Sequence, residues 1–259
     1  MTEQALQYTA QFGEDRRLQE IFRDLTTGVC VEVGGYDGVS GSNTYLFEQL
    51  GWQCLIVEPM PDYCAMIRHK RPGSIVVQAA ASASSGMASF YVARGAETLS
   101  TLQCDEQHLA RIHEEGGDIE EIRVRTERLD HLLEEVHFER VDFITIDVEG
   151  VEYSVLQGFT LDRYAPKIVI IEDHDDLADD TIYRHMLQQG YRYFLRTGCN
   201  DWYVNAAVAH LVDLSGERAL QRLRSLYKLK HRTKSLHRVC YPLLKFVWDK
   251  YKQHVGRSN

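Results

Sequence analysis

The chain has 259 residues, of which 44% are hydrophobic and 26% are charged, and its formal net charge is −9. This composition is typical of a folded protein with a large core, and it excludes disordered, collagen-like and coiled-coil proteins. The acidic balance argues against a dedicated nucleic-acid binder, so we expect no nucleic-acid partner.

Targeting signals are missing from the printed sequence. No apolar run reaches the ~18 residues of a membrane span, and residues 1–17 lack the basic flank and apolar stretch of a signal peptide. The six cysteines are widely spaced, which is typical of reduced thiols. These features predict a cytoplasmic protein.

The charge is distributed unevenly along the chain. Residues 216–259 contain 12 Lys or Arg and two acids, a net charge of +10, so residues 1–215 have a net charge of −19. We therefore predict a domain over residues 1–215 and a basic tail over residues 216–259.

Strand-like and helix-like segments alternate through residues 1–215, which predicts an α/β fold. Short β-branched runs predict strands at Val29–Gly34, Cys54–Glu58, Ile75–Ala79, Val141–Asp147, Lys167–Glu172, Tyr191–Leu195 and Trp202–Val208. Helices are predicted between them at Glu14–Leu25, Asn43–Leu50, Pro61–His69, Tyr153–Gly158 and Asp180–Gln189. Ala88–Ala93 and Glu121–Thr126 predict an antiparallel edge or insertion.

A glycine-rich turn follows the first predicted strand, in the sequence VCVEVGGYDG of residues 29–38. Glycine allows the backbone to approach a ligand closely. The next strand ends in Glu58, 20 residues after Gly38, where an acid can hold the ribose hydroxyls of a nucleoside cofactor. A strand-to-loop turn without a ligand is the alternative, but the combination favours a nucleoside cofactor.

The type of cofactor follows from Glu32, two residues before Gly34. The sequence lacks the G-x-G-x-x-G fingerprint of dinucleotide binding. A carboxylate at position 32 would repel a pyrophosphate, whereas it suits the cationic amino-acid end of S-adenosylmethionine (SAM). We therefore predict methyl transfer in preference to hydride transfer.

Two acidic clusters lie at the ends of later predicted strands, where ligands bind in open α/β sheets. Asp147 and Glu149 follow one strand, and Glu172, Asp173 and His174 follow the next. Such groups can act as a general base toward a hydroxyl. Alternatively, Asp147, Glu172, Asp173 and His174 are candidate ligands of a divalent cation. Asp147, Glu149 and His174 are the predicted catalytic residues.

The motif order resembles the FkbM family of SAM-dependent methyltransferases over about residues 8–204. The resemblance rests on QFGED at 11–15, VEVGGYDG at 31–38, SNT at 42–44, GW at 51–52, IVEP at 56–59, IDVEGVE at 146–152, and the motifs VLxG at 155–158 and IExH at 171–174. It implies a class I methyltransferase fold, which is a Rossmann-like, seven-stranded, mostly parallel sheet whose last strand is antiparallel.

The resemblance also implies O-methylation, commonly of sugar hydroxyls in bacterial surface glycans or of secondary metabolites. It places Glu32, Gly34 and Asp37 beside the methionine part of SAM, Glu58 at the ribose and Asp147 beside the methyl group. The same pocket includes Gln11 and Asn43, and Gly35 stands in the turn where alanine is usual. Thr145 stands where many members have lysine.

We therefore expect an O-methyltransferase whose partner is a glycan or another small molecule with a hydroxyl group. The alternative is a non-catalytic SAM-binding subunit that acts as a scaffold in a glycan-assembly complex. In the tail, apolar residues from Leu236 to Tyr251 recur at helical spacing among basic ones. This basic amphipathic helix predicts either peripheral contact with the inner face of an anionic membrane or packing on the protein's own acidic domain or on a second copy.

Overall fold

The computed structural model describes residues 5–173 and 179–232. The chain divides into two compact units, Met1–Glu172 and Asp173–Asn259, and each is described by itself. The larger sheet has seven strands, in the order β3-β2-β1-β7-β8-β10-β9. The predicted seven-stranded, mostly parallel sheet is thereby confirmed.

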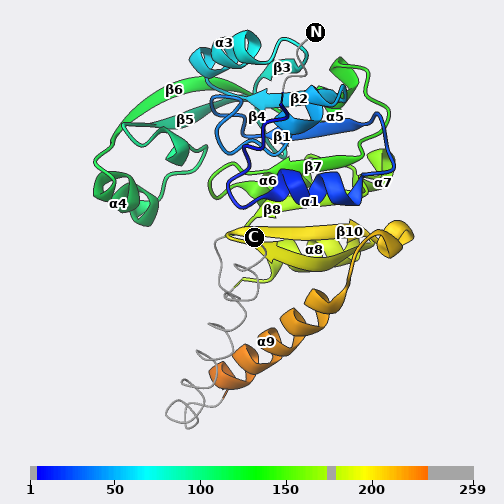
Figure 1. Ribbon diagram of the computed structural model, residues 1–259. Helices are drawn as coiled ribbons and strands as arrows, with labels where there is room; N and C mark the ends of the chain where they lie inside the picture. Colours follow the sequence, from blue (N-terminus) through cyan, green and yellow to red (C-terminus); the bar gives the residue numbers. More distant parts are fainter. Residues whose placement is uncertain (1–4, 174–178, 233–259) are drawn as a thin grey trace. The chain divides into compact units, whose positions relative to one another are not determined.

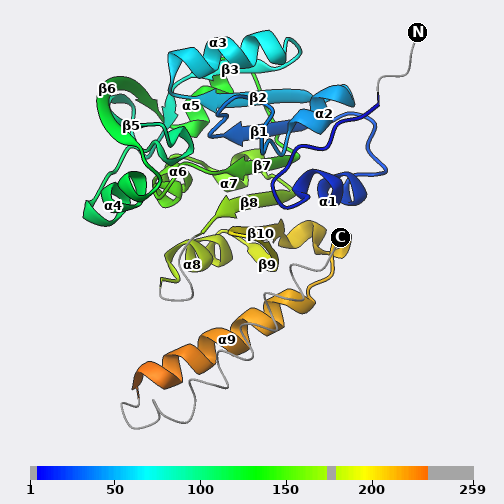
Figure 2. The same ribbon diagram turned by 60° about the vertical axis from the view of Figure 1, so that its left-hand side comes forward.

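The first unit provides five parallel strands, which follow one another from top to bottom in Figure 2. In sheet order they are β3 (Ile75–Gln78), β2 (Gln53–Glu58), β1 (Val29–Val33), β7 (Phe143–Ile146) and β8 (Ile168–Glu172). All residues of β1, β7 and β8 are buried, because these strands are rich in Val and Ile and are covered on both faces. Their carboxyl ends therefore reach the same edge of the sheet.

Helices of this unit cover the parallel strands. They are α1 (Glu14–Ile21), α2 (Tyr45–Gln49), α3 (Pro61–Lys70), α5 (Leu129–Glu135), α6 (Glu152–Gln157) and α7 (Leu161–Tyr164). Helix α3 begins with a proline, which is favoured at the first helical position, and it packs on β2 and β3. The ring of Phe47, on α2, and the ring of Trp52, which follows this helix, pack against Phe143 of β7 with ring centroids 4.7 and 5.9 Å away.

A separate three-stranded sheet projects from the five parallel strands (Figure 1). It consists of β4 (Ala80–Ala81), β6 (Asp118–Glu127) and β5 (Gly86–Arg94), in that order. Strands β5 and β6 are antiparallel, which confirms the predicted pair. The 3-10 helix η1 (Glu97–Leu99) and helix α4 (Glu106–Glu114) connect them, and α4 packs on β6. The sequence did not predict α4.

The second unit contains an antiparallel hairpin and a long helix. Its elements are α8 (Thr181–Gln188), β9 (Tyr191–Thr197), β10 (Asn200–Asn205), η2 (Ala206–Leu211) and α9 (Ser215–Arg232). The strand predicted to reach Val208 ends at Asn205, because the Asn205 side chain accepts a hydrogen bond from the Ala207 amide and starts η2. Leu220 and Leu223 of α9 are buried.

The predicted tail helix from Leu236 to Tyr251 lies outside the described residues. Within the described part of the chain, none of the helices is long and apolar enough to cross a membrane.

Candidate functional site

The glycine turn after β1 lies against the end of β7. Gly34 has a φ of +92°, and a Cβ atom there would lie 1.8 Å from the backbone oxygen of Asp147. A Cβ at Gly35 would lie 2.4 Å from Ile56 of β2. Any side chain at Gly34 would therefore push apart the ends of β1 and β7, so their close approach requires glycine at this position. The predicted contact of Gly34 and Gly35 with SAM stays a prediction.

Glu32 is the buried acid at the end of β1, and its carboxylate holds the segment 42–44. It accepts hydrogen bonds from the Ser42 hydroxyl at 2.7 Å, the Asn43 amide at 2.9 Å and the Thr44 hydroxyl at 2.6 Å. Arg71 adds an ion pair at 3.2 Å. The described contacts of Glu32 are thus internal, and its predicted contact with the methionine part of SAM stays a prediction.

Asn43 has an acceptor without a partner among the described residues. Its side-chain amide nitrogen donates to Thr145 Oγ1 at 3.0 Å, which fixes the orientation of the amide group. The oxygen Oδ1 is buried and accepts no hydrogen bond, although the residue is only 8% exposed. Because a buried acceptor without a donor is costly, this atom fits a site that is completed by a ligand donor such as an ammonium group.

Asp37 and Gln11 lie on the loop that follows the glycine turn and on the segment that pairs with it. Asp37 accepts hydrogen bonds from Lys70 at 2.8 Å and from the Val39 and Ser40 amides. Burial alone would raise the pKa of Asp37, but these donors outweigh it and lower the pKa to about 2. Gln11 is exposed and follows Ala10, which pairs with Gly41.

Glu58 ends β2, beside the turn. Its carboxylate accepts hydrogen bonds from the backbone amides of Tyr36 at 3.0 Å and Met60 at 2.9 Å. Burial raises the pKa of Glu58 to about 7, against the opposing effect of these amide donors. The acid predicted to hold a ribose is therefore positioned at the edge of the parallel strands, next to the turn.

Carboxylates crowd together after β7. Ligand atoms of Asp147, Glu149 and Glu172 lie within 4.8 Å of one another. Asp147 is exposed, yet crowding by protein atoms raises the pKa of its carboxyl group well above the usual value, and the neighbouring Glu172, Glu149 and Glu152 raise it further. When Asp147 is protonated it can donate a hydrogen bond to Glu172, so this cluster can hold a proton.

The loop that contains these acids is held in place by its own contacts. Glu152 accepts hydrogen bonds from the Val148 amide at 3.2 Å and the Gly150 amide at 3.0 Å, and Thr101 donates to the Glu149 backbone oxygen at 2.8 Å. Arg111 of α4 pairs with the Glu149 carboxylate at 3.2 Å. The three clustered carboxylates have the hard oxygen donors of a divalent-cation site, but Glu149 already has a cationic partner. Metal binding stays a prediction.

The remaining candidates lie in the second unit. Asp173 is buried, and its amide donates to the Cys199 backbone oxygen at 2.9 Å, while its own backbone oxygen accepts from Arg196. His174, predicted as a catalytic residue and metal ligand, lies outside the described residues. Its role, like that of Asp173, stays a prediction.

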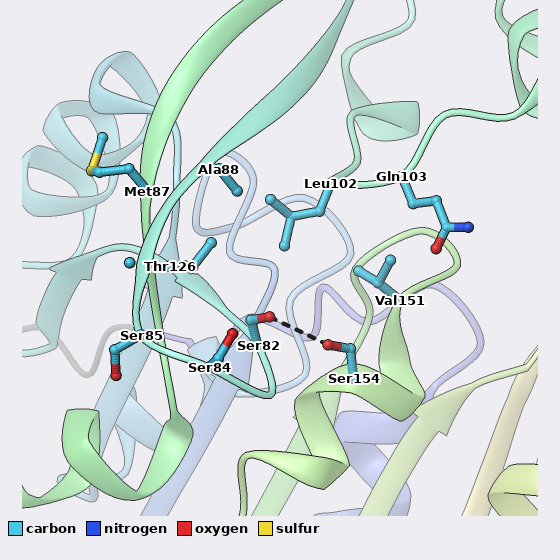
Figure 3. A pocket seen from close by; sticks show the side chains of 11 residues that line it. Ser82, Ser84, Ser85, Met87, Ala88, Leu102, Gln103, Thr126, Val151 and Ser154 are labelled. Atoms are coloured by element: carbon cyan, nitrogen blue, oxygen red, sulfur yellow. Dashed lines mark hydrogen bonds between the residues drawn. The ribbon is translucent and has the colours of Figure 1, made fainter.

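A pocket of about 350 Å³ lies between the small sheet and the start of α6 (Figure 3). Its lining combines hydroxyl groups with apolar side chains and includes Ser82, Thr126, Leu102, Val151 and Ser154. The hydroxyls of Ser82 and Ser154 face each other at 3.3 Å. The lining residues contain no charged side chain.

Comparison with known proteins identifies the family. The methyltransferase FkbM domain model matches residues 32–193, more than half of the chain. The chain belongs to the FkbM methyltransferase family. The match extends from Glu32, at the end of β1, into β9, so it includes the glycine turn and the acidic loop.

Solved structures resemble this FkbM methyltransferase at low sequence identity. A putative RNA methyltransferase from Pyrococcus horikoshii has 10% identity and a TM-score of 0.41, with 74% of this chain and 82% of the other covered. A precorrin-6y C5,15-methyltransferase from Geobacter metallireducens GS-15 has 11% identity and a TM-score of 0.42, with 79% and 91% covered. A glycopeptide N-methyltransferase in complex with SAM has 10% identity and a TM-score of 0.32, with 73% and 84% covered. The comparison with curated proteins finds no match.

Sequence reasoning missed two cations in this FkbM methyltransferase. Arg71 follows α3 and is fully buried beside Glu32, and Arg111 lies on the unpredicted helix α4. Neither arginine lies in a sequence motif. Each is distant in sequence from the acid that it contacts, so no local pattern indicates the pair. The excess of acids in residues 1–215 is the only signal that cations near these acids would matter.

Proposed function

We propose that the chain is a SAM-dependent O-methyltransferase that acts on a sugar hydroxyl of a bacterial surface glycan or on a hydroxyl of a secondary metabolite. The observation on which the proposal depends is the position of Asp147, a carboxyl group of raised pKa whose backbone oxygen lies against the cofactor-type turn at Gly34. A proton acceptor beside a cofactor turn is what hydroxyl methylation requires. Membership of the FkbM methyltransferase family supports methyl transfer as the reaction.

The residues present fit SAM. Gly34 allows the turn to pack against the end of β7, and the buried Oδ1 of Asn43 offers an acceptor for the ammonium group of the methionine part. The Glu58 carboxylate suits the ribose hydroxyls. We assign the adenine ring of SAM to the pocket in Figure 3. Leu102, which lines this pocket, packs in one hydrophobic cluster with Met60, two residues after Glu58.

Bound SAM supplies an electrophilic methyl group on a sulfonium centre. Asp147 would accept the proton that the acceptor hydroxyl loses when its oxygen takes the methyl group, while the methyl–sulfur bond breaks and S-adenosylhomocysteine leaves. The raised pKa makes the ionised form of Asp147 a stronger base than an ordinary aspartate, and protonated Asp147 is then stabilised by a hydrogen bond to Glu172. Arg111 holds Glu149 beside them, so the loop is already ordered when the acceptor binds.

The proposal is tested in two steps with the full chain. Isothermal titration with S-adenosylhomocysteine measures cofactor binding, and transfer of a labelled methyl group from SAM to a panel of glycosides measures activity. We expect binding and transfer to a hydroxyl. Binding without transfer to any hydroxyl acceptor would favour the scaffold alternative, and tight binding of a nicotinamide dinucleotide instead would refute the proposal.

The finer predictions on location and partners remain proposals. We propose a cytoplasmic protein that meets its acceptor at the inner face of the membrane, supported by the net charge of +10 over residues 216–259. Sedimentation with anionic vesicles, compared with neutral ones, tests this contact, and size-exclusion chromatography tests self-association through the same residues.

A further inference from the structure

We propose that Arg71 is a positioning residue for the cofactor, which holds the glycine turn and the segment 42–44 in the shape that binds SAM. This inference rests on the proposed function. Arg71 is not part of any recognised motif. It follows α3 directly, whereas all the residues that its guanidinium group contacts precede β2 in the sequence.

The guanidinium group of Arg71 joins parts of the chain that each border the cofactor turn. It pairs with Glu32 at 3.2 Å and with Glu48 of α2 at 2.7 Å. It also donates to the Gly38 backbone oxygen, the Ser42 hydroxyl and the Thr44 hydroxyl, each at 3.1 Å. One side chain thus connects the end of β1, the glycine turn, the segment 42–44 and α2.

Because Arg71 is buried, each of its hydrogen-bond donors needs an acceptor within the protein. The Arg71 side chain is 0% exposed, so the protein must replace all of its lost hydration. Two carboxylates and three neutral oxygens do this, and their arrangement requires the planar, forked guanidinium group. A lysine has the same charge but only one nitrogen, so it cannot reach all five acceptors.

The position of Asn43 connects this network with ligand binding. Asn43 lies between Ser42 and Thr44, which both donate to Glu32 and contact Arg71. Its backbone amide also donates to Glu32. The network therefore fixes the segment on which the unpartnered Asn43 Oδ1 stands. Without Arg71 this acceptor would lose its defined place, and the affinity for SAM would fall.

The test compares Arg71→Met and Arg71→Lys with the wild type. We expect Arg71→Met to weaken S-adenosylhomocysteine binding by about 10- to 100-fold, because hydrogen bonds to a charged group are lost. Arg71→Lys restores binding only in part. At saturating SAM the kcat stays within about threefold of the wild type, so the effect is confined to KM for SAM, as expected for a positioning role.

Two further measurements separate positioning from general stability. Arg163→Met removes an arginine whose side chain is 53% exposed and paired with Glu134, and it should leave binding unchanged. Added guanidinium ion at millimolar concentration should partly restore the affinity of Arg71→Ala, since it can occupy the vacated site, whereas sodium ion should not. If Arg71→Met does not fold, Arg71→Lys and Glu48→Gln provide the same comparison.

The outcomes distinguish this inference from the proposed function. A wild type that fails to bind S-adenosylhomocysteine refutes the proposed function. A wild type that binds, together with folded Arg71 variants of equal affinity, or with a loss in kcat and none in KM, refutes the positioning role alone.

Discussion

Two neighbouring strands end in carboxylates with opposite kinds of partner. At the end of β1, Glu32 faces a buried cation and three further donors. At the end of β7, Asp147 faces other carboxylates, and its pKa is raised. The first arrangement holds the Glu32 carboxylate in one position and thereby stabilises the shape of the glycine turn. The second makes a proton acceptor. The chemistry of an acid in this site is thus set by its neighbours and not by its residue type.

The largest expected effect is on Asp147. Asp147→Asn keeps the shape of the side chain but removes the base, so kcat for methyl transfer should fall by about 10²- to 10⁴-fold. Affinity for S-adenosylhomocysteine should change little, because the turn network is intact. Steady-state kinetics and titration measure the two quantities. The matched control Asp162→Asn alters an exposed acid on α7, and equal activity of both variants would contradict the assignment.

The next largest effect is expected on cofactor affinity, from the close approach between Gly34 after β1 and Asp147 after β7. Gly34→Ala would place a methyl group against the Asp147 backbone oxygen, whereas Gly41→Ala has nothing within 4 Å. Both positions have positive φ, at +92° and +74°, so the backbone strain is matched. We expect Gly34→Ala to weaken S-adenosylhomocysteine binding by about 100-fold more than Gly41→Ala. Similar affinities would show that the close approach does not shape the cofactor site.

Glu58 lies between these two arrangements, since among the described residues it has amide donors but no ion pair with a cation. Its folded-state pKa is about 7 against a usual 4.5, so the folded protein keeps this proton where the unfolded chain has lost it. The resulting stabilisation is fully present below about pH 4.5 and is lost as the pH rises toward 7, by about 3 kcal/mol.

Urea unfolding of the wild type and Glu58→Gln across this pH range checks the prediction. The variant should lack this loss of stability, because its amide does not titrate. Parallel curves for the two proteins would mean that Glu58 has an ordinary pKa in the fold.

Much of this molecule was predictable from local pattern. The β-branched runs of β1, β7 and β8 indicated the parallel strands, and the glycine turn with Glu58 and Glu32 was the basis for predicting SAM. The partners of the acids were not predictable. Arg71 reaches Glu32 across 39 positions, and Arg111 reaches Glu149 across 38, so only the fold brings them together. Helix α4 was missed because it joins two strands of an insertion, outside the alternating pattern.

The packing of α9 has a practical consequence for shortening the chain. The charge pattern suggests a boundary at residue 215, but Leu220 and Leu223 are buried and α9 packs on β9. Gly216 approaches β9 so closely that a Cβ atom would lie 2.0 Å from the Phe194 backbone oxygen. A chain cut at residue 215 would uncover an apolar strip of β9, which favours aggregation. The cut that preserves the hairpin lies beyond Leu223.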